Sequence, residues 1–264
     1  MNEVIRSSDN SIVKKIRKVH SRKKGDELVY IEGVRIVEDC LLSGGVCDRL
    51  ICSEKKYDVA SELADKYGIS SLDISVLDDG LFDRISSTVN SQGVAMLVNV
   101  PKYSNSIIEN KDNAVYCILD CVQDPGNVGT IIRLADAFDF DAVIITGGTA
   151  DPFGEKALRA SMGSSWHIPV VTFNDDVSLV KELNSRNITT LGMHLRGDNL
   201  DTAELRLPCA FIIGNEGKGM SDDVSSLCTS LVKIPMPGRA ESLNAASAAS
   251  VIGNELRKAR DLTL

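Results

Sequence analysis

The fold of this chain is decided mainly by one stretch, Lys233-Ile-Pro-Met-Pro-Gly-Arg-Ala-Glu-Ser-Leu-Asn244, which continues as Ala-Ala-Ser-Ala-Ala-Ser250. An apolar strand end runs into two prolines, which stiffen the backbone and hold the residues before them extended. Ser242 is predicted to cap a helix lined with Ala and Ser, which another backbone can approach closely. A rigid loop that ends at a helix N-terminus suits a polar ligand. By itself, the stretch also fits an ordinary strand–turn–helix connection.

Two further glycine-rich loops follow apolar strands, Leu119-Asp-Cys-Val-Gln-Asp-Pro-Gly-Asn-Val-Gly-Thr-Ile-Ile-Arg133 and Phe211-Ile-Ile-Gly-Asn-Glu-Gly-Lys-Gly-Met-Ser221. Glycines permit close approach of the backbone to a ligand. The spacing of these glycines matches neither a P-loop nor a dinucleotide fingerprint. Ligands in open α/β sheets bind at the carboxyl ends of strands, so the three loops are predicted to converge on one site.

In this order, the three loops resemble the three motifs of the SpoU (TrmH) branch of the SPOUT RNA methyltransferases. The resemblance covers about the last 150 residues, counted from the expected strand boundaries. The N-terminal third is similar, more weakly, to the substrate-binding domain often attached to this family. The resemblance implies an α/β fold in which a parallel-sheet C-terminal domain carries a deep trefoil knot that forms the cofactor pocket, and a small N-terminal α/β domain is L30e-like. Residue spacing itself does not indicate a knot.

The resemblance also implies an activity, in which S-adenosyl-L-methionine donates a methyl group to a ribose 2′-hydroxyl of RNA. We expect 23S rRNA as the substrate, because the N-terminal domain resembles that of rRNA-directed members; tRNA is the alternative. A non-catalytic RNA-binding or ribosome-assembly factor is a competing hypothesis, and a nucleotide-binding enzyme such as an NTPase is disfavoured by the missing P-loop. The family's homodimers, with sites drawn from both subunits, imply a homodimer here. The target nucleotide, its base and a housekeeping or antibiotic-resistance role do not follow from the sequence.

Arg133 is the first catalytic candidate, because it matches the motif arginine of the family. A guanidinium is essentially never deprotonated in a protein, so stabilisation of the developing alkoxide is a better role for it than that of a base. The alternative is a surface arginine paired with Asp136 one helical turn on. Four further positions match catalytic residues of the family: Asn127, Glu216, Ser242 and Asn244.

Each of two catalytic candidates also has an ordinary structural explanation. Asn127 is placed to cap a helix, and Glu216 is placed in a turn where a solvated acid is common. For the cofactor, an adenine needs an apolar slot with a few polar groups, which the third loop offers. The cofactor-binding positions implied by the resemblance are Gly214, Glu216, Gly217, Gly219, Ile234, Met236 and Leu243.

The composition is that of a globular protein able to bury a core, with 43% hydrophobic and 25% charged residues among 264. No apolar run is long enough to span a bilayer, and the N-terminus lacks the apolar core of a signal peptide, so we expect a cytoplasmic protein with no membrane partner. Seven cysteines without a Cys-x-x-Cys pair, and three isolated histidines, predict neither a disulfide framework nor a bound metal.

The charge is unevenly distributed along the chain. The net charge is −8, yet the first 24 residues hold eight basic residues against two acidic ones. A basic segment on an acidic body can steer a polyanion to one face. The alternative is the solvated side of an amphipathic helix whose apolar side carries Ile12, Val13, Ile16 and Val19; the two interpretations are compatible. The predicted RNA-binding residues are Lys14, Lys15, Arg17, Lys18, Arg22 and Lys23.

Two domains are predicted, over residues 1–100 and 114–264, joined by a polar linker at residues 101–113. The first alternates helices and strands, as a small α/β domain does. The second has continuous apolar strands joined by helices, which predicts a parallel sheet covered on both faces. Expected helices span 11–23, 32–42, 59–67, 128–138, 155–162, 177–185 and 243–260; expected strands span 49–52, 72–76, 93–100, 115–119, 142–146, 169–173, 189–194, 210–213 and 231–234.

Overall fold

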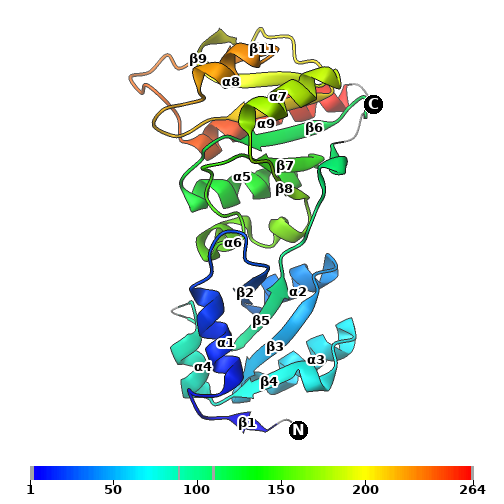
Figure 1. Ribbon diagram of the computed structural model, residues 1–264, viewed down its shortest axis with the longest axis vertical. Coiled ribbons are helices and arrows are strands. Elements are labelled where there is room, and N and C mark those ends of the chain that lie inside the picture. Colours follow the sequence, from blue (N-terminus) through cyan, green and yellow to red (C-terminus); the bar gives the residue numbers. More distant parts are fainter. Residues whose placement is uncertain (1–2, 89, 109–110, 263–264) are drawn as a thin grey trace. The chain divides into compact units, whose positions relative to one another are not determined.

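The structure is a computed structural model that describes residues 3–88, 90–108 and 111–262. Its contacts divide the chain into two compact units (Figure 1). Unit 1 comprises Met1–Pro101 with Phe153–Glu155, and unit 2 comprises Lys102–Pro152 with Lys156–Leu264. Each unit is built on its own β-sheet.

Unit 1 contains a mixed five-stranded sheet in the order β1-β4-β3-β5-β2. β4 pairs in parallel with β1 and β3, whereas β5 pairs antiparallel with β3 and β2. Its strands are β1 (Val4–Ile5), β2 (Leu28–Glu32), β3 (Cys47–Ser53), β4 (Ile74–Leu77) and β5 (Val94–Asn99), and its helices are α1 (Ser11–His20), α2 (Val34–Leu42), α3 (Tyr57–Tyr67) and α4 (Asp79–Ile85).

Helices cover both faces of the unit 1 sheet, with α1 and α4 on one side and α2 and α3 on the other (Figure 1). On α1, Val13, Ile16 and Val19 recur at helical spacing and are all buried. They share a core with Phe82 of α4 and with alternate residues of the strands. Packing of one amphipathic face therefore stabilises α1, whose opposite face carries the charges.

Several expected boundaries in unit 1 are wrong by a few residues. The helix expected over 32–42 begins at Val34, because Glu32 ends β2 and Gly33 adopts φ +112°, a conformation that favours glycine and separates strand from helix. The strand β2 itself was not expected from the sequence, although its β-branched and aromatic residues suit a buried strand. The first helix ends at His20 rather than at residue 23.

Unit 2 contains a six-stranded sheet in the order β11-β9-β10-β6-β7-β8, and every pairing in it is parallel. This confirms the predicted parallel α/β fold. Its strands are β6 (Val115–Leu119), β7 (Ala142–Ile145), β8 (Val170–Thr172), β9 (Thr189–Asn199), β10 (Cys209–Ile213) and β11 (Ser230–Lys233), and its helices are α5 (Pro125–Ala137), α6 (Glu155–Ser161), α7 (Asp176–Ser185), α8 (Asp222–Leu227) and α9 (Ala245–Asp261).

The central strands of this sheet are buried on both sides, as their continuous apolar sequences predict. Residues of α7 and α8 pack into a core with alternate residues of β6, β7 and β10. On the other side, α5 and α9 pack against each other, and Gly253 of α9 leaves room for Leu134 of α5 and for its C-cap residue Phe138. Added at Gly253, a Cβ atom would lie 3.2 Å from both side chains.

The strand β9 is longer than expected and runs on to Asn199. Its pairing with β11 shifts register, because Leu231 lies opposite Gly192 whereas Val232 lies opposite Asp198. The intervening residues of β9 therefore have no partner in β11 and form a bulge. Gly197 lets this bulge return to the sheet, since a Cβ atom there would lie 2.5 Å from the backbone nitrogen of Val232.

Two short helices, α4 and α8, were also not expected. Each begins after a side chain that caps its free N–H groups: Asp78 accepts from Leu81 N, and Ser221 accepts from Val224 N.

Across the described ranges, no helix is long and apolar enough to cross a membrane. None of the seven cysteines, all of which lie in the described ranges, forms a disulfide.

Candidate active site

Three loops of unit 2 leave the carboxyl ends of β6, β10 and β11 and lead into α5, α8 and α9. These are the loops that the sequence singled out. A cavity of ≈ 560 Å³ opens between the second and third of them and the bulge of β9. Its lining includes Met193, His194, Leu195, Arg196, Ile213, Gly214, Asn215, Glu216, Gly217, Lys218, Gly219, Val232, Lys233, Ile234, Met236, Glu241, Ser242, Leu243, Ala245 and Ala248.

Glu216 links the second loop to the first. Its Oε2 accepts a hydrogen bond from Gln123 N at 3.0 Å, and its Oε1 accepts from Asp124 N at 3.1 Å. The same Oε1 also accepts from the Nδ2 of Asn127, at 3.0 Å. The Glu216 carboxylate thus accepts hydrogen bonds from three donors near the start of α5. The alternative interpretation, in which Glu216 is only a solvated residue of a turn, is therefore wrong.

Asn127 extends this link to the third loop. Its Oδ1 accepts a hydrogen bond from Asn244 Nδ2 at 2.9 Å, so Glu216, Asn127 and Asn244 form a chain through all three loops. The N-cap role considered for Asn127 is wrong, because Asp124 caps α5 and Pro125 occupies its first position.

Asn244 also begins the last helix. Its Oδ1 accepts from Ala246 N at 2.9 Å and from Ser247 N at 3.3 Å, so Asn244 is the N-cap of α9. The expectation that Ser242 would cap this helix is therefore wrong. Two residues earlier, Ser242 is exposed and lines the cavity instead. The Asn244 side chain therefore both caps α9 and bonds to Asn127 of the first loop. The position of the third loop thus depends on the first loop.

Asn215 holds the second loop in shape. Its Nδ2 donates to Cys121 O at 2.9 Å, and its Oδ1 accepts from the backbone N–H groups of Gly217 and Lys218. The backbone of Asn215 pairs with that of Gly219 in both directions. The loop between β10 and α8 is thus closed on itself and tied to the loop after β6.

Hydrogen bonds keep the Glu216 carboxylate ionised. Partial burial by itself raises its pKa, but the donors Gln123 N, Asn127 Nδ2 and Asp124 N together outweigh burial and hold the pKa below the ordinary value of 4.5. The group is therefore a carboxylate throughout the neutral range. The three donors bond to the ionised form more strongly than to the protonated one, and they therefore stabilise the carboxylate.

This pKa shift predicts how stability depends on pH. A carboxyl whose pKa is lowered on folding stabilises the fold fully above its unfolded pKa, and this contribution is lost as the pH falls through the lowered pKa. The difference in free energy of unfolding between wild type and Glu216→Gln should therefore be constant above about pH 5 and shrink in more acid solution. Urea unfolding of both proteins across a pH series measures it. A difference that instead grows on acidification would contradict the assignment.

Gly214 lies where the second loop folds back on the strand. A Cβ atom at this position would lie 2.4 Å from Met220 N and 2.6 Å from the carbonyl carbon of Gly219, both backbone atoms that cannot move aside easily. By contrast, a Cβ atom at Gly217 meets only Asn215 Oδ1, at 3.7 Å, and one at Gly219 meets nothing within 4 Å. The last two glycines thus leave bare backbone at the cavity, where a ligand can approach closely.

Gly214→Ala is expected to destabilise unit 2 by about 1–3 kcal/mol, because the methyl group displaces the backbone at Gly219 and Met220. Gly217→Ala is the matched control, and we expect it to change stability by less than about 0.5 kcal/mol, since its methyl group has room. Urea unfolding of the full chain, followed by a spectroscopic signal, compares the two variants. Equal stability of both variants would show that the close approach at Gly214 is unimportant.

All seven positions predicted to bind a cofactor line this one cavity. Ile234, Met236 and Leu243 supply apolar walls, and Leu243 keeps 41% of its surface exposed at the edge. A partly exposed leucine beside bare glycine backbone suits a ligand with both a flat apolar part and polar groups.

Arg133 lies apart from the cavity lining. It is exposed on α5, and its side chain has no hydrogen bond or ion pair within residues 3–88, 90–108 and 111–262. The pairing with Asp136 considered for it is wrong, because Asp136 Oδ2 lies 3.1 Å from His167 Nδ1. The structure thus brings Asn127, Glu216 and Asn244 into contact, places Ser242 at the cavity, and leaves Arg133 free to act elsewhere.

The basic segment predicted to bind RNA is partly neutralised within unit 1. Lys15 Nζ lies 2.7 Å from Asp48 Oδ2, and Lys14 Nζ lies 3.3 Å from Asp9 Oδ1. Backbone carbonyls accept from Arg17 and Arg22, at 3.4 Å (Ser8 O) and 2.8 Å (Asp26 O) respectively. Lys18 and Lys23 are exposed, and their ammonium groups make no such contact in the described chain.

The sequence did not single out every residue of the cavity wall. The bulge Met193–Arg196 and the two cations Lys218 and Lys233 line it as well. The glycines on either side of the bulge, Gly192 and Gly197, were the available signal, because paired glycines in a strand often mark a bulge.

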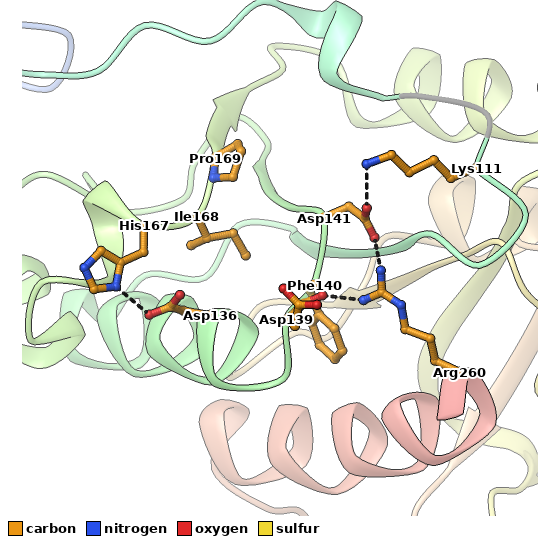
Figure 2. Close-up of a pocket in the computed structure, with 9 residues that line it drawn as sticks. All are labelled: Lys111, Asp136, Asp139, Phe140, Asp141, His167, Ile168, Pro169 and Arg260. Carbon is orange, nitrogen blue, oxygen red and sulfur yellow. Dashed lines mark hydrogen bonds and ion pairs between the residues drawn. The ribbon is translucent and has the colours of Figure 1, made fainter. Parts of the chain in front are cut away.

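A second hollow, of ≈ 360 Å³, lies where the C-terminal ends of α5 and α9 meet the start of β7 (Figure 2). Its charged groups bind one another. Asp141 pairs with Arg260 at 3.1 Å and with Lys111 at 3.3 Å, and its Oδ2 also accepts from Val115 N at 2.9 Å. Side-chain exposures of 9% for Asp141 and 14% for Arg260 make this pair a clamp that holds α9 to the sheet.

The comparisons with known proteins agree with this geometry. The model of the SpoU rRNA methylase family matches residues 114–254, the part of the chain that carries all three loops. The chain belongs to the SpoU rRNA methylase family. The model of an MRM3-like substrate binding domain matches residues 10–96. Among curated relatives in the family, the 23S rRNA (guanosine(2553)-2′-O)-methyltransferase RlmP of Bacillus subtilis is 32% identical, over 96% of this chain and 98% of the relative.

Solved structures of the family extend the similarity to nearly the whole chain. The AdoMet-bound rRNA methyltransferase of Sinorhizobium meliloti is 28% identical with a TM-score of 0.83, over 97% of this chain and 98% of the other. The SpoU methyltransferase AviRb of Streptomyces viridochromogenes, in complex with the cofactor AdoMet, is 25% identical with a TM-score of 0.84, over 96% and 100% of the two chains.

Proposed function

We propose that this protein transfers the methyl group of S-adenosyl-L-methionine to a ribose 2′-hydroxyl of 23S rRNA. The observation that carries the proposal is the chain of hydrogen bonds from Glu216 through Asn127 to Asn244, which joins the three family motifs beside one cavity. The name of the B. subtilis relative supports the choice of 23S rRNA. A tRNA substrate is the alternative.

The cavity suits S-adenosyl-L-methionine in size and lining. Its volume of ≈ 560 Å³ falls within the usual range for a small-molecule site. Ile234, Met236 and Leu243 would contact the adenine, and the bare backbone at Gly217 and Gly219 would approach the polar parts. When bound, the cofactor supplies an electrophilic methyl group. Glu216 would hold the second loop against the first, so that the cavity keeps its shape while the substrate binds.

Arg133 would act on the RNA rather than on the cofactor. A permanent positive charge placed beside the target ribose binds the neighbouring phosphate and stabilises the alkoxide as the 2′-hydroxyl loses its proton. The proton would leave to water or to a phosphate oxygen, because the guanidinium cannot accept it. Ser242, which is exposed at the cavity, would hold Arg133 or a phosphate.

A homodimer would explain why Arg133 is exposed and has no partner among the described residues of one chain. Arg133 would then project toward the cavity of the partner subunit, and the exposed face of α5 would form part of the interface together with α9. On α9, Val251 keeps 38% of its surface exposed, and such an interface would cover it. The likeness to the solved SpoU structures supports a deep trefoil knot in unit 2, with the cavity at its threaded loops.

Unit 1 would bind the RNA substrate. The match of residues 10–96 to an MRM3-like substrate binding domain supports this role and an L30e-like fold for the unit. The proposed division is residues 1–100 for RNA binding, 101–113 as linker and 114–264 for methyl transfer. Within unit 1, Lys18 and Lys23 are the cations of the basic segment best placed to contact phosphates, since their ammonium groups are free within the part of unit 1 that the structure describes.

Isothermal titration with S-adenosyl-L-methionine, with ATP as the control titrant, tests the proposal first. Binding of S-adenosyl-L-methionine alone supports it, and ribose-methylation mapping of rRNA and tRNA from cells with and without the protein then identifies the substrate. A folded protein that binds neither compound, with or without RNA, would favour a non-catalytic RNA-binding factor. Loss of a methyl group from tRNA alone would replace 23S rRNA by the alternative substrate.

A further inference from the structure

We infer that Lys218, Lys233 and Arg239, here called the lip cations, bind phosphates of the RNA that flank the target nucleotide. The inference rests on the proposed function and names residues of the same site. Lys218 and Lys233 line the cavity, and Arg239 lies in the loop that supplies Met236 and Ser242 to its wall. All three side chains are exposed.

The lip cations, like Arg133, have no hydrogen bond or ion pair in the described chain, unlike most other basic residues of unit 2. Within the described ranges, none of the three side chains makes a hydrogen bond or an ion pair. Elsewhere in the unit, cations are held by acids: Arg186 by Glu182, Arg257 by Asp261, and Arg206 by Glu204. Figure 2 shows the same for Lys111 and Arg260, which share Asp141.

A shortage of acids does not explain this difference. Residues 102–264 contain 21 Asp and Glu against 15 Lys and Arg. Two acids even lie at the cavity: Glu216 is occupied by its three donors, and Glu241 makes no ion pair with any of the lip cations. Unpaired cations gathered at one edge of an acidic domain form an electrostatic footprint for a polyanion.

The backbone that carries two of the lip cations is well fixed. Lys218 N donates to Asn215 Oδ1 at 2.9 Å, and the carbonyl of Lys233 accepts from Leu200 N at 2.9 Å. Arg133, on α5, also has no partner among the described residues. The first loop, which leads into α5, is joined to the third loop by the Asn127–Asn244 hydrogen bond. A ribose held near the cavity brings its own 5′ and 3′ phosphates, and these are the anions that such fixed cations would meet.

The carboxylate of the cofactor is the competing anion for these cations. One carboxylate can engage one or two cations, whereas three cations spread over two loops suit the regularly spaced charges of a nucleic acid backbone. The two occupants differ in salt dependence, because each phosphate contact releases counterions and steepens the fall of RNA affinity with salt.

The test compares the full-length wild type with the triple variant Lys218→Gln/Lys233→Gln/Arg239→Gln. The probe is in-vitro-transcribed 23S rRNA, bound over a series of potassium chloride concentrations, and S-adenosyl-L-methionine is titrated separately. We expect the triple variant to bind the RNA roughly 100-fold more weakly at 0.1 M salt and to lower the slope of log affinity against log salt by about 2, at ~0.7 per contact. Its affinity for S-adenosyl-L-methionine should equal that of the wild type.

A second triple variant, Lys181→Gln/Arg206→Gln/Lys258→Gln, removes the same charge from exposed positions outside the cavity and should keep the wild-type slope. If both triple variants show the same slope, the lip cations do not bind phosphate. Weaker binding of S-adenosyl-L-methionine with an unchanged slope would assign them to the cofactor carboxylate and overturn the inference. A wild type that does not methylate RNA would refute the proposed function instead, while the salt slopes would still decide the role of the lip cations.

Discussion

Arg133→Ala should lower methyl transfer by roughly 1,000-fold, the usual effect of removing a group that stabilises charge in a transition state. Affinity for S-adenosyl-L-methionine should stay at the wild-type value, because Arg133 does not line the cavity. Its removal also breaks no hydrogen bond or ion pair, since the side chain forms none among the described residues. Single-turnover transfer of a labelled methyl group to 23S rRNA, together with calorimetric titration of the cofactor, measures both quantities.

Arg133→Lys separates charge from shape. Lysine keeps the positive charge but lacks the planar fork that binds a phosphate through two hydrogen bonds, so its activity should lie between those of wild type and Arg133→Ala. Wild-type turnover in the alanine variant would remove Arg133 from the mechanism. Activity of the alanine variant that recovers as the pH rises would mean that a proton acceptor, rather than Arg133, limits the reaction.

Mixed dimers test whether Arg133 serves the partner's cavity. Arg133→Ala keeps an intact cavity, and Glu216→Gln keeps an intact arginine, so a heterodimer of the two contains one complete site if the arginine acts across the interface. When the two impaired proteins are mixed under exchange conditions, the heterodimer should then have about half the activity of a wild-type dimer. If Arg133 serves its own chain, each site keeps one defect and no activity returns.

Glu216→Gln should lower kcat/KM about 100-fold, although the two side chains have nearly the same size. Oε2 accepts from Gln123 N and Oε1 accepts from Asp124 N and Asn127 Nδ2. In glutamine, one of these oxygens becomes an NH2 group, so whichever way the amide turns, at least one backbone N–H faces a donor. The first loop would move away from the second, and the Asn127–Asn244 hydrogen bond would weaken with it.

Asp223→Asn is the control for loss of charge. Asp223 is an exposed acid in the first turn of α8, close in sequence to the second loop, and no described group bonds to its carboxylate. Steady-state methylation assays on both variants should show near-wild-type activity for Asp223→Asn only. Equal loss in the two variants would point to net charge, and full activity in Glu216→Gln would show that the three hydrogen bonds do not matter for catalysis.

Local sequence signals were sufficient for most of unit 2. The strand expected at 115–119 is β6 at the same residues, because a run of Val, Tyr, Cys, Ile and Leu bounded by polar residues suits only a strand buried on both faces. In unit 1 the same reasoning missed β2. Its sequence leads directly into a helix, and only the positive φ of Gly33 separates the two.

The local sequence does not determine which of two suitable residues caps each of the helices α5 and α9. Ser242 and Asn244 are both good N-caps by residue type, and so are Asp124 and Asn127. The structure uses Asn244 and Asp124, and it uses Asn127 to bond both Glu216 and Asn244. Nothing within a few residues of these positions distinguishes the choices, because the deciding partners come from other loops.

The sequence by itself determined the family, the parallel sheet of unit 2 and the three loops that meet beside the cavity, since these depend on residue types at short spacing. Only the tertiary structure decided which side chains meet. Asn127 bonds to Glu216 across 89 residues and to Asn244 across 117 residues. Such contacts follow from the strand order β11-β9-β10-β6, which is set by packing of the whole sheet and not by the spacing of residues along any one loop.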